Sequence, residues 1–247
     1  MTGIERPYKR TARPFPNGSY LHGPRRYIRD PRFAKDAAMY IRGFMLLQKD
    51  LEHLFEYIEP DDHNLECYSF RVYDLLLRAS IEVETNCKAI LQENGYAKTS
   101  NLTMNDYKKI EASHRLSGFE VKMPVWRGRN GIRGPFRVWS VDQALPWYQA
   151  YNKTKHNRSE AFKDATFKHA IDAVCGVLVV LSAQFTIEDF PLTEGYVGKG
   201  ASHGFECAIG DYFVVRYPEW PYEERYNLKE WEMLRKEPDP FQNFPYP

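Results

Sequence analysis

The segment WYQAYNKTKHNR, residues 147 to 158, concentrates polar and basic side chains that could take part in chemistry. Asn152 and His156 are four residues apart, so on a helix they share one face, with Tyr148 one turn earlier. Histidine titrates near neutrality and can remove a proton from a hydroxyl group. This segment is therefore the first candidate for a catalytic site.

Metal-independent cleavage of RNA is the reaction that these residue types would fit. The ribose 2′-hydroxyl attacks the adjacent phosphorus, so one group must remove its proton and another must stabilise charge on the phosphoryl oxygens. His156 suits the first task. Arginine suits the second because its charged fork binds phosphate through two bonds, whereas Tyr151 offers one hydrogen bond and no positive charge. The cations that could compensate are Lys153, Lys155 and Arg158.

A structural interpretation of the same residues stays open. His156 at a helix end is favourable through the helix dipole, and Asn152 can bond nearby backbone groups. On an earlier predicted helix, Glu84 and Lys88 are four residues apart and fit an ordinary helix ion pair.

A second basic cluster lies in WRGRNGIRG, where Arg127, Arg129 and Arg133 occur in a Gly-rich stretch. On a flexible backbone these side chains could bind RNA phosphates, and the alternative is a solvated hairpin loop. The sequence lacks GK[ST], which argues against a Walker-type phosphate loop. The remaining histidines show neither HxH nor HExxH spacing, so we expect neither a metal nor another cofactor.

Helices must position the 147 to 158 segment. Apolar residues recur at helical spacing over 33 to 58 and 68 to 90, which predicts an antiparallel hairpin with Asn64 as a cap and a stop at Gly95. A third helix, from Phe162 to Phe185, is apolar nearly all round and should be the most buried.

The candidate segment itself should begin a helix at Pro146. Asn157 and Glu160 match a capping box, which predicts a break near His156 and a restart, the alternative being one bent helix.

Two regions show residue patterns that are typical of β-strands. Within 97 to 144, the runs FEVKMPVW (119 to 126) and FRVW (136 to 139) predict a β-hairpin, and FECAIGDYFVVRY predicts another with a two-residue Gly-Asp turn. NLKEWEMLRK (227 to 236) fits a short surface helix before a proline-rich tail. The predicted fold is mainly α, an antiparallel helical bundle with a small β-hairpin insertion and an irregular or β C-terminal extension.

This order of elements, with YNKTKHNR at a late helix junction, resembles the HEPN superfamily of helical-bundle proteins. HEPN ribonucleases carry an arginine, a polar residue and a histidine four to six residues beyond the arginine. Here Asn152 takes the polar position and His156 the histidine position, while Tyr151 stands where the arginine is expected. The resemblance covers roughly residues 33 to 186.

The resemblance implies binding of RNA or a nucleotide, and metal-independent endoribonuclease activity of a bacterial defence or toxin type. It also implies a homodimer in which two copies of the motif face each other. Some HEPN proteins place an acidic and basic pair beside the histidine, a role that Glu84 and Lys88 would take. The alternative, from another class, is a catalytically inactive bundle that serves as an interaction module.

The distribution of charge along the chain is more informative about its organisation than the net charge of +1. Residues 1 to 32 form a basic arm that we expect to dock on the body or on a partner protein, and the stretch from Glu219 to Glu237 is mainly acidic. We expect a bundle over 33 to 186, with 97 to 144 inserted, and an extension over 187 to 247.

The cysteines are widely spread, which favours reduced and mostly buried thiols. The longest apolar run, 173 to 181, is too short to cross a bilayer, so we expect a soluble cytoplasmic protein without a membrane segment.

Overall fold

A mainly helical fold with a small sheet is what the computed structural model shows. It describes residues 3–20, 25–188, 190 and 206–247, so the Gly-rich stretch after Phe190 and the histidines at 22 and 203 lie outside the described residues. Helices account for 49% of the chain, and a small antiparallel sheet has four strands. The prediction of a mainly α fold with a β insertion and a β C-terminal extension is confirmed at this level.

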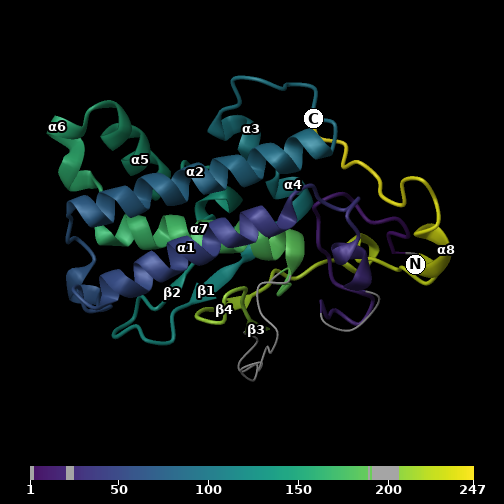
Figure 1. Ribbon diagram of the computed structural model, residues 1–247, viewed down its shortest axis with the longest axis horizontal. Coiled ribbons are helices and arrows are strands. Elements are labelled where there is room, and N and C mark those ends of the chain that lie inside the picture. Colours follow the sequence, from purple (N-terminus) through teal and green to yellow (C-terminus); the bar gives the residue numbers. More distant parts are fainter. Residues whose placement is uncertain (1–2, 21–24, 189, 191–205) are drawn as a thin grey trace.

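Helices α1, Ala37–Phe55, and α2, Phe70–Glu93, form the predicted antiparallel hairpin (Figure 1). The expected cap at Asn64 is wrong, because its side-chain amide donates to the carbonyl of Glu59 before the hairpin turns. Ser69 caps α2 instead, and its hydroxyl accepts a hydrogen bond from the backbone N–H of Val72.

Gly95 follows the end of α2 with a φ of 76°. This left-handed conformation is one that glycine adopts without strain, so the predicted stop is confirmed.

Helix α7, Phe167–Phe185, is the central helix and contacts α1, α2 and α5. Every residue from 173 to 185 is buried, as its all-round apolar sequence predicts. The helix is long and apolar enough to cross a membrane by composition, but 83% of its most apolar window is buried inside the protein.

The remaining helices are shorter and cover the hairpin and α7: α3, Met104–Lys108; α4, Glu111–His114; α5, Pro146–His156; α6, Arg158–Ala161; and α8, Trp231–Leu234. The predicted start at Pro146 and the break after His156 are both confirmed. The predicted capping box does not form, because the side chains of Asn157 and Glu160 bond each other at 2.6 Å and Asn157 makes no side-chain cap bond.

Four short strands join the insertion to the C-terminal extension: β1, Glu120–Lys122; β2, Ile132–Arg133; β3, Glu206–Cys207; and β4, Val214–Arg216. Their order is β2-β1-β4-β3, all antiparallel, with Val121 opposite Val215. Each of the two predicted regions contributes a hairpin, although the first pairs β1 with Ile132–Arg133 and not with the predicted run 136 to 139. The second has a longer connection than the expected two residues, because Cys207 pairs with Val214.

The run 136 to 139 is not a strand. It leads into a 3₁₀ helix, Arg137–Val141, which Phe136 precedes, and the rings of Phe136 and Trp139 are both buried with centroids 4.7 Å apart. Three-residue spacing puts these rings on the same side of a 3₁₀ turn, whereas a strand would point them to opposite faces. Ile132 and Arg133, expected in the loop, form the partner strand instead.

The basic arm docks on the body, one of the two outcomes expected for it. The Arg10 side chain is fully buried, with Nε 2.8 Å from Glu93 Oε1 at the end of α2, and it donates to Gln184 Oε1 on α7. Arg13, also buried, lies over the ring of Trp220 and 3.5 Å from Glu224.

The acidic C-terminal stretch and the basic arm also meet on the surface, where Arg6 pairs with Glu237. These charges therefore stabilise the chain's own fold.

Candidate functional site

The predicted pair on α5 faces outward. Tyr151, Trp147, Ala150 and Thr154 form the buried side of α5. Asn152 is half-buried and His156 is exposed on the opposite side of this helix. The amide and the imidazole therefore share a solvent-facing surface, as expected, although within the described residues neither side chain has a hydrogen-bond partner that would hold it in place.

Tyr151 does not form part of that surface. Its side chain is fully buried, and its hydroxyl accepts a hydrogen bond of 3.0 Å from the ammonium of Lys155. This bond raises the pKa of Lys155. The Tyr151 hydroxyl is therefore not exposed for contact with a phosphate in this structure, and the Lys155 ammonium is directed toward the tyrosine.

Glu84 also has a structural partner. Its carboxylate accepts a hydrogen bond of 2.7 Å from the hydroxyl of Tyr148, which joins α2 to α5. Burial, followed by this bond, raises the pKa of Tyr148. In the described part of the chain, Glu84 and Lys88 form no ion pair, and Lys88 is exposed. Among the described residues, the predicted ion pair between Glu84 and Lys88 is therefore absent, and Glu84 bonds Tyr148 in the first turn of α5.

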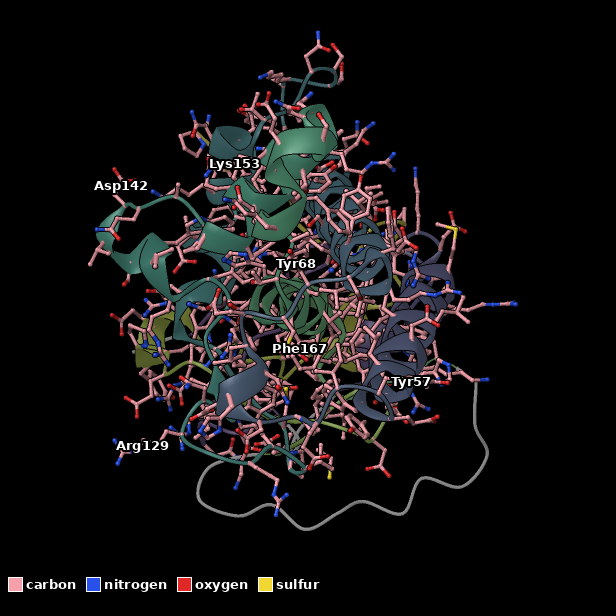
Figure 2. The ribbon with its side chains drawn as sticks, turned by 90° about the vertical axis from the view of Figure 1, so that its left-hand side faces the viewer. Tyr57, Tyr68, Arg129, Asp142, Lys153 and Phe167 are labelled. Atoms are coloured by element: carbon pink, nitrogen blue, oxygen red, sulfur yellow. The ribbon has the colours of Figure 1, made fainter. Side chains whose placement is uncertain are left out.

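The arginines of the Gly-rich stretch separate. Arg133 is buried with Nε 2.7 Å from Asp172 Oδ1 on α7, so it is not available to RNA. Arg127 is exposed and lies 3.6 Å from Glu59. Arg129 projects from the periphery of the molecule, well apart from Lys153 (Figure 2).

The side chain of Asp62 holds the loop that carries these arginines in place. Asp62 accepts hydrogen bonds from the backbone N–H groups of Arg129 and Asn130 and from the indole of Trp126, and the indole bond is first among the causes that lower its pKa to about 2. The loop is therefore fixed rather than flexible.

A groove lies at the end of the bundle where α5, α6 and the starts of α2 and α7 meet. We call it the bundle-end groove; its volume is about 560 Å³, and it is lined by Glu66, Tyr68, Pro146, Gln149, Ala150, Lys153, Lys163, Asp164, Thr166 and His169. Lys153 is the one predicted site residue in it, with its ammonium 3.7 Å from Asp164. Asn152 and His156 lie on the neighbouring face of α5, outside the groove lining.

Aromatic rings gather beside this groove. Tyr68 and Phe70, which are 54% and 62% exposed, pack around Phe162 with centroid distances of 5.7 and 4.7 Å. The guanidinium of Arg158 lies 5.8 Å from the centre of the Phe70 ring. We call Tyr68, Phe70, Phe162, Arg158, Lys153 and Lys163 the bundle-end surface. Figure 2 looks onto this end of the molecule and shows Tyr68 and Lys153 on the same face.

The start of α7 supports the groove. Thr166 caps the helix, and the backbone N–H groups of Phe167 and Lys168 donate to the carbonyls of Cys67 and Leu65. These bonds hold the segment before α2 against the start of α7, which places Tyr68 and His169 in one groove lining.

His169, Lys163 and the exposed rings of Tyr68 and Phe70 were not predicted as site residues from the sequence. Thr166, three residues before His169, is a residue type that caps helices and so marks the start of α7. A helix start this close to the 147 to 158 segment is the signal that could have indicated His169 and Lys163. The pairing of residues 65–68 with the start of α7 has no local signal in the sequence.

The fold and the site together define a mainly helical protein with an aromatic and basic surface at one end. Comparison with known proteins finds no matching family model, no similar curated protein and no matching solved structure. Within the described residues, no group of three or more histidine, cysteine or acidic side chains is arranged to hold a metal ion.

Proposed function

We propose that this protein binds single-stranded RNA through the bundle-end surface. One observation carries the proposal: large aromatic rings, more than half exposed at Tyr68 and Phe70, lie beside Arg158, Lys153 and Lys163. Proteins that bind single strands combine such rings, on which bases stack, with cations that follow the phosphates.

The local charge supports the same conclusion. From residue 153 to residue 168 the chain carries Lys153, Lys155, Arg158, Lys163 and Lys168 against Glu160 and Asp164. The Glu160 carboxylate accepts a hydrogen bond of 2.6 Å from the side-chain amide of Asn157. The resemblance to HEPN proteins points to RNA as well, and the homodimer and the defence role that it implies remain part of this proposal.

The inactive interaction module receives less support. Its expected contact regions, the basic arm and the acidic C-terminal stretch, bond each other through pairs such as Arg13 with Glu224 and Arg6 with Glu237. Side chains used in this way are not available to a partner protein without first breaking the internal pairs.

Fluorescence anisotropy with a labelled single-stranded RNA of about 20 nucleotides tests the proposal. Tyr68→Ala and Phe70→Ala should each weaken binding about 5- to 150-fold, since base stacking contributes about 1–3 kcal/mol per ring. Tyr57→Ala is the matched control, because Tyr57 is 75% exposed and lies on another part of the same end view (Figure 2).

Binding by the unmodified protein should weaken as salt rises, because its cations displace counterions from the phosphates. Absence of saturable binding at low salt, or equal losses for Tyr57→Ala and Phe70→Ala, would show that this surface does not bind RNA.

A further inference from the structure

A histidine that the motif does not include lies in the bundle-end groove. His169 is in the first turn of α7 and lines the groove together with Tyr68, Lys153 and Lys163. Its Nδ1 lies 2.9 Å from the backbone carbonyl oxygen of Asp164 and 3.2 Å from the hydroxyl of Thr166.

These contacts fix the protonation pattern of the ring. A carbonyl oxygen only accepts, so Nδ1 carries a proton and donates it to Asp164. In the neutral imidazole, Nε2 is then the atom with the free lone pair. A backbone carbonyl that orients a histidine in this way is the arrangement that a general base needs. In the described part of the chain, His156 has no such partner.

We propose that His169, rather than His156, is the general base of a metal-independent RNA cleavage site in this groove. The inference rests on the proposed function, because the RNA must first bind at the bundle end. With a base stacked on Tyr68, the sugar that follows it would lie along the groove, within the same lining as His169.

The reaction balances without a metal or a second substrate. His169 Nε2 takes the proton of the ribose 2′-hydroxyl, and the 2′-oxygen forms a bond to the adjacent phosphorus while the bond from phosphorus to the 5′-oxygen breaks. The 5′-oxygen keeps the electron pair and takes a proton from solvent, and His169 releases its acquired proton to solvent, which restores the neutral imidazole. The products are a 2′,3′-cyclic phosphate end and a 5′-hydroxyl end.

Lysines in the groove would stabilise the charge on the phosphoryl oxygens. Lys153 is 3.7 Å from Asp164, a weak contact that a phosphate can replace. Lys163 is exposed and, within the described residues, has no ion pair. Glu66 and Asp164 also line the groove, so the lysines are needed to offset their charge before a phosphate can enter.

The test is cleavage of a labelled single-stranded RNA by the full chain in the presence of EDTA, with binding measured on the same samples. His169→Asn is the informative variant, because the asparagine amide can still donate to the Asp164 carbonyl while the Nε2 lone pair is lost. Its cleavage rate should fall at least about 100-fold with RNA affinity within about threefold of the unmodified protein. His156→Ala is the matched control and should keep its cleavage rate within about threefold.

The other outcomes would contradict either the assignment of His169 as the general base or the proposed RNA binding. Cleavage that survives in His169→Asn but disappears in His156→Ala would assign the base to the motif histidine. Saturable RNA binding without cleavage in EDTA would remove this inference and leave the proposed function standing. Absence of binding would remove the proposed function itself. Circular dichroism of His169→Asn verifies that the variant is folded.

Discussion

At position 151 the side chain is a fully buried aromatic ring. The ring packs 5.3 Å from that of Tyr148, and its hydroxyl is bonded to Lys155. Tyr151 therefore belongs to the contact between α5 and the core. Under the proposed function, the positive charge that a phosphate needs comes from Lys153, Lys163 and Arg158 of the bundle-end surface.

Substitutions at Tyr151 should separate packing from binding. Tyr151→Phe removes only the hydroxyl and should cost about 1 kcal/mol of unfolding free energy, whereas Tyr151→Ala leaves a cavity and should cost about 3–5 kcal/mol. Urea denaturation measures both. RNA affinity should stay within about twofold for Tyr151→Phe, and a tenfold loss with unchanged stability would show that the hydroxyl contacts RNA.

A buried histidine should make the stability depend on pH. His114 lies between Ser113 and the backbone carbonyl of Arg10, and burial lowers its pKa to about 4. Since a histidine in the unfolded chain titrates near 6.5, the unfolded state takes up the proton first as the pH falls. Stability should therefore decrease between pH 6.5 and 4, by about 3 kcal/mol in total from this group.

Urea unfolding at pH 7 and pH 4.5 measures this effect, with His114→Gln as the comparison. The variant should be less stable at pH 7 but should show a smaller decrease on acidification. An equal decrease in both proteins would show that other groups cause the acid sensitivity.

Among the elements, the helices were predictable and the short strands only in part. The apolar stripes of α1, α2 and α7 are long enough for their periodicity to distinguish a helix from a strand. Strands of two or three residues carry too little pattern, and the central pairing of β1 with β4 joins segments about 90 residues apart. For the same reason the groove was not predictable, because residues 65–68 meet the start of α7 through long-range backbone bonds.

The cap of α2 should contribute measurably to stability. The Ser69 hydroxyl accepts from the N–H of Val72 at 3.2 Å, and Phe70 of the bundle-end surface is the first residue of the helix. Ser69→Ala should lower the unfolding free energy by about 1 kcal/mol, and Ser69→Asp should preserve it. Thermal denaturation compares the two, and equal melting temperatures for Ser69→Ala and the unmodified protein would contradict the cap.

For the whole molecule, the two terminal regions are parts of the fold that composition alone could not place. A run of arginines indicates a basic arm, but it does not reveal that Arg10 reaches Glu93 and Gln184 in the interior. The C-terminal tail docks in the same area, where the Tyr246 hydroxyl bonds Ser113 and Phe241 is buried. The segments near both termini thus pack at one end of the helical bundle (Figure 1). The bundle-end groove lies at the other end.

Removal of one buried arginine should therefore destabilise the whole chain. Arg10→Ala leaves Glu93 and Gln184 without their cation and should cost about 3–5 kcal/mol. Arg6→Ala is the control, because its pair with Glu237 is exposed and should contribute at most about 1 kcal/mol. Chemical denaturation measures both, and similar losses would show that the arm is held by surface charge.

Photo-crosslinking would locate the part of the protein that contacts single-stranded RNA. Single-stranded RNA containing 4-thiouridine is bound to the full chain, irradiated, and the attached peptides are identified by mass spectrometry. We expect crosslinks to peptides that contain Tyr68, Phe70 and Phe162, and their loss in the presence of excess unlabelled RNA. Crosslinks confined to the loop around Arg129, or to the docked arm around Arg13, would contradict RNA binding at the bundle-end surface.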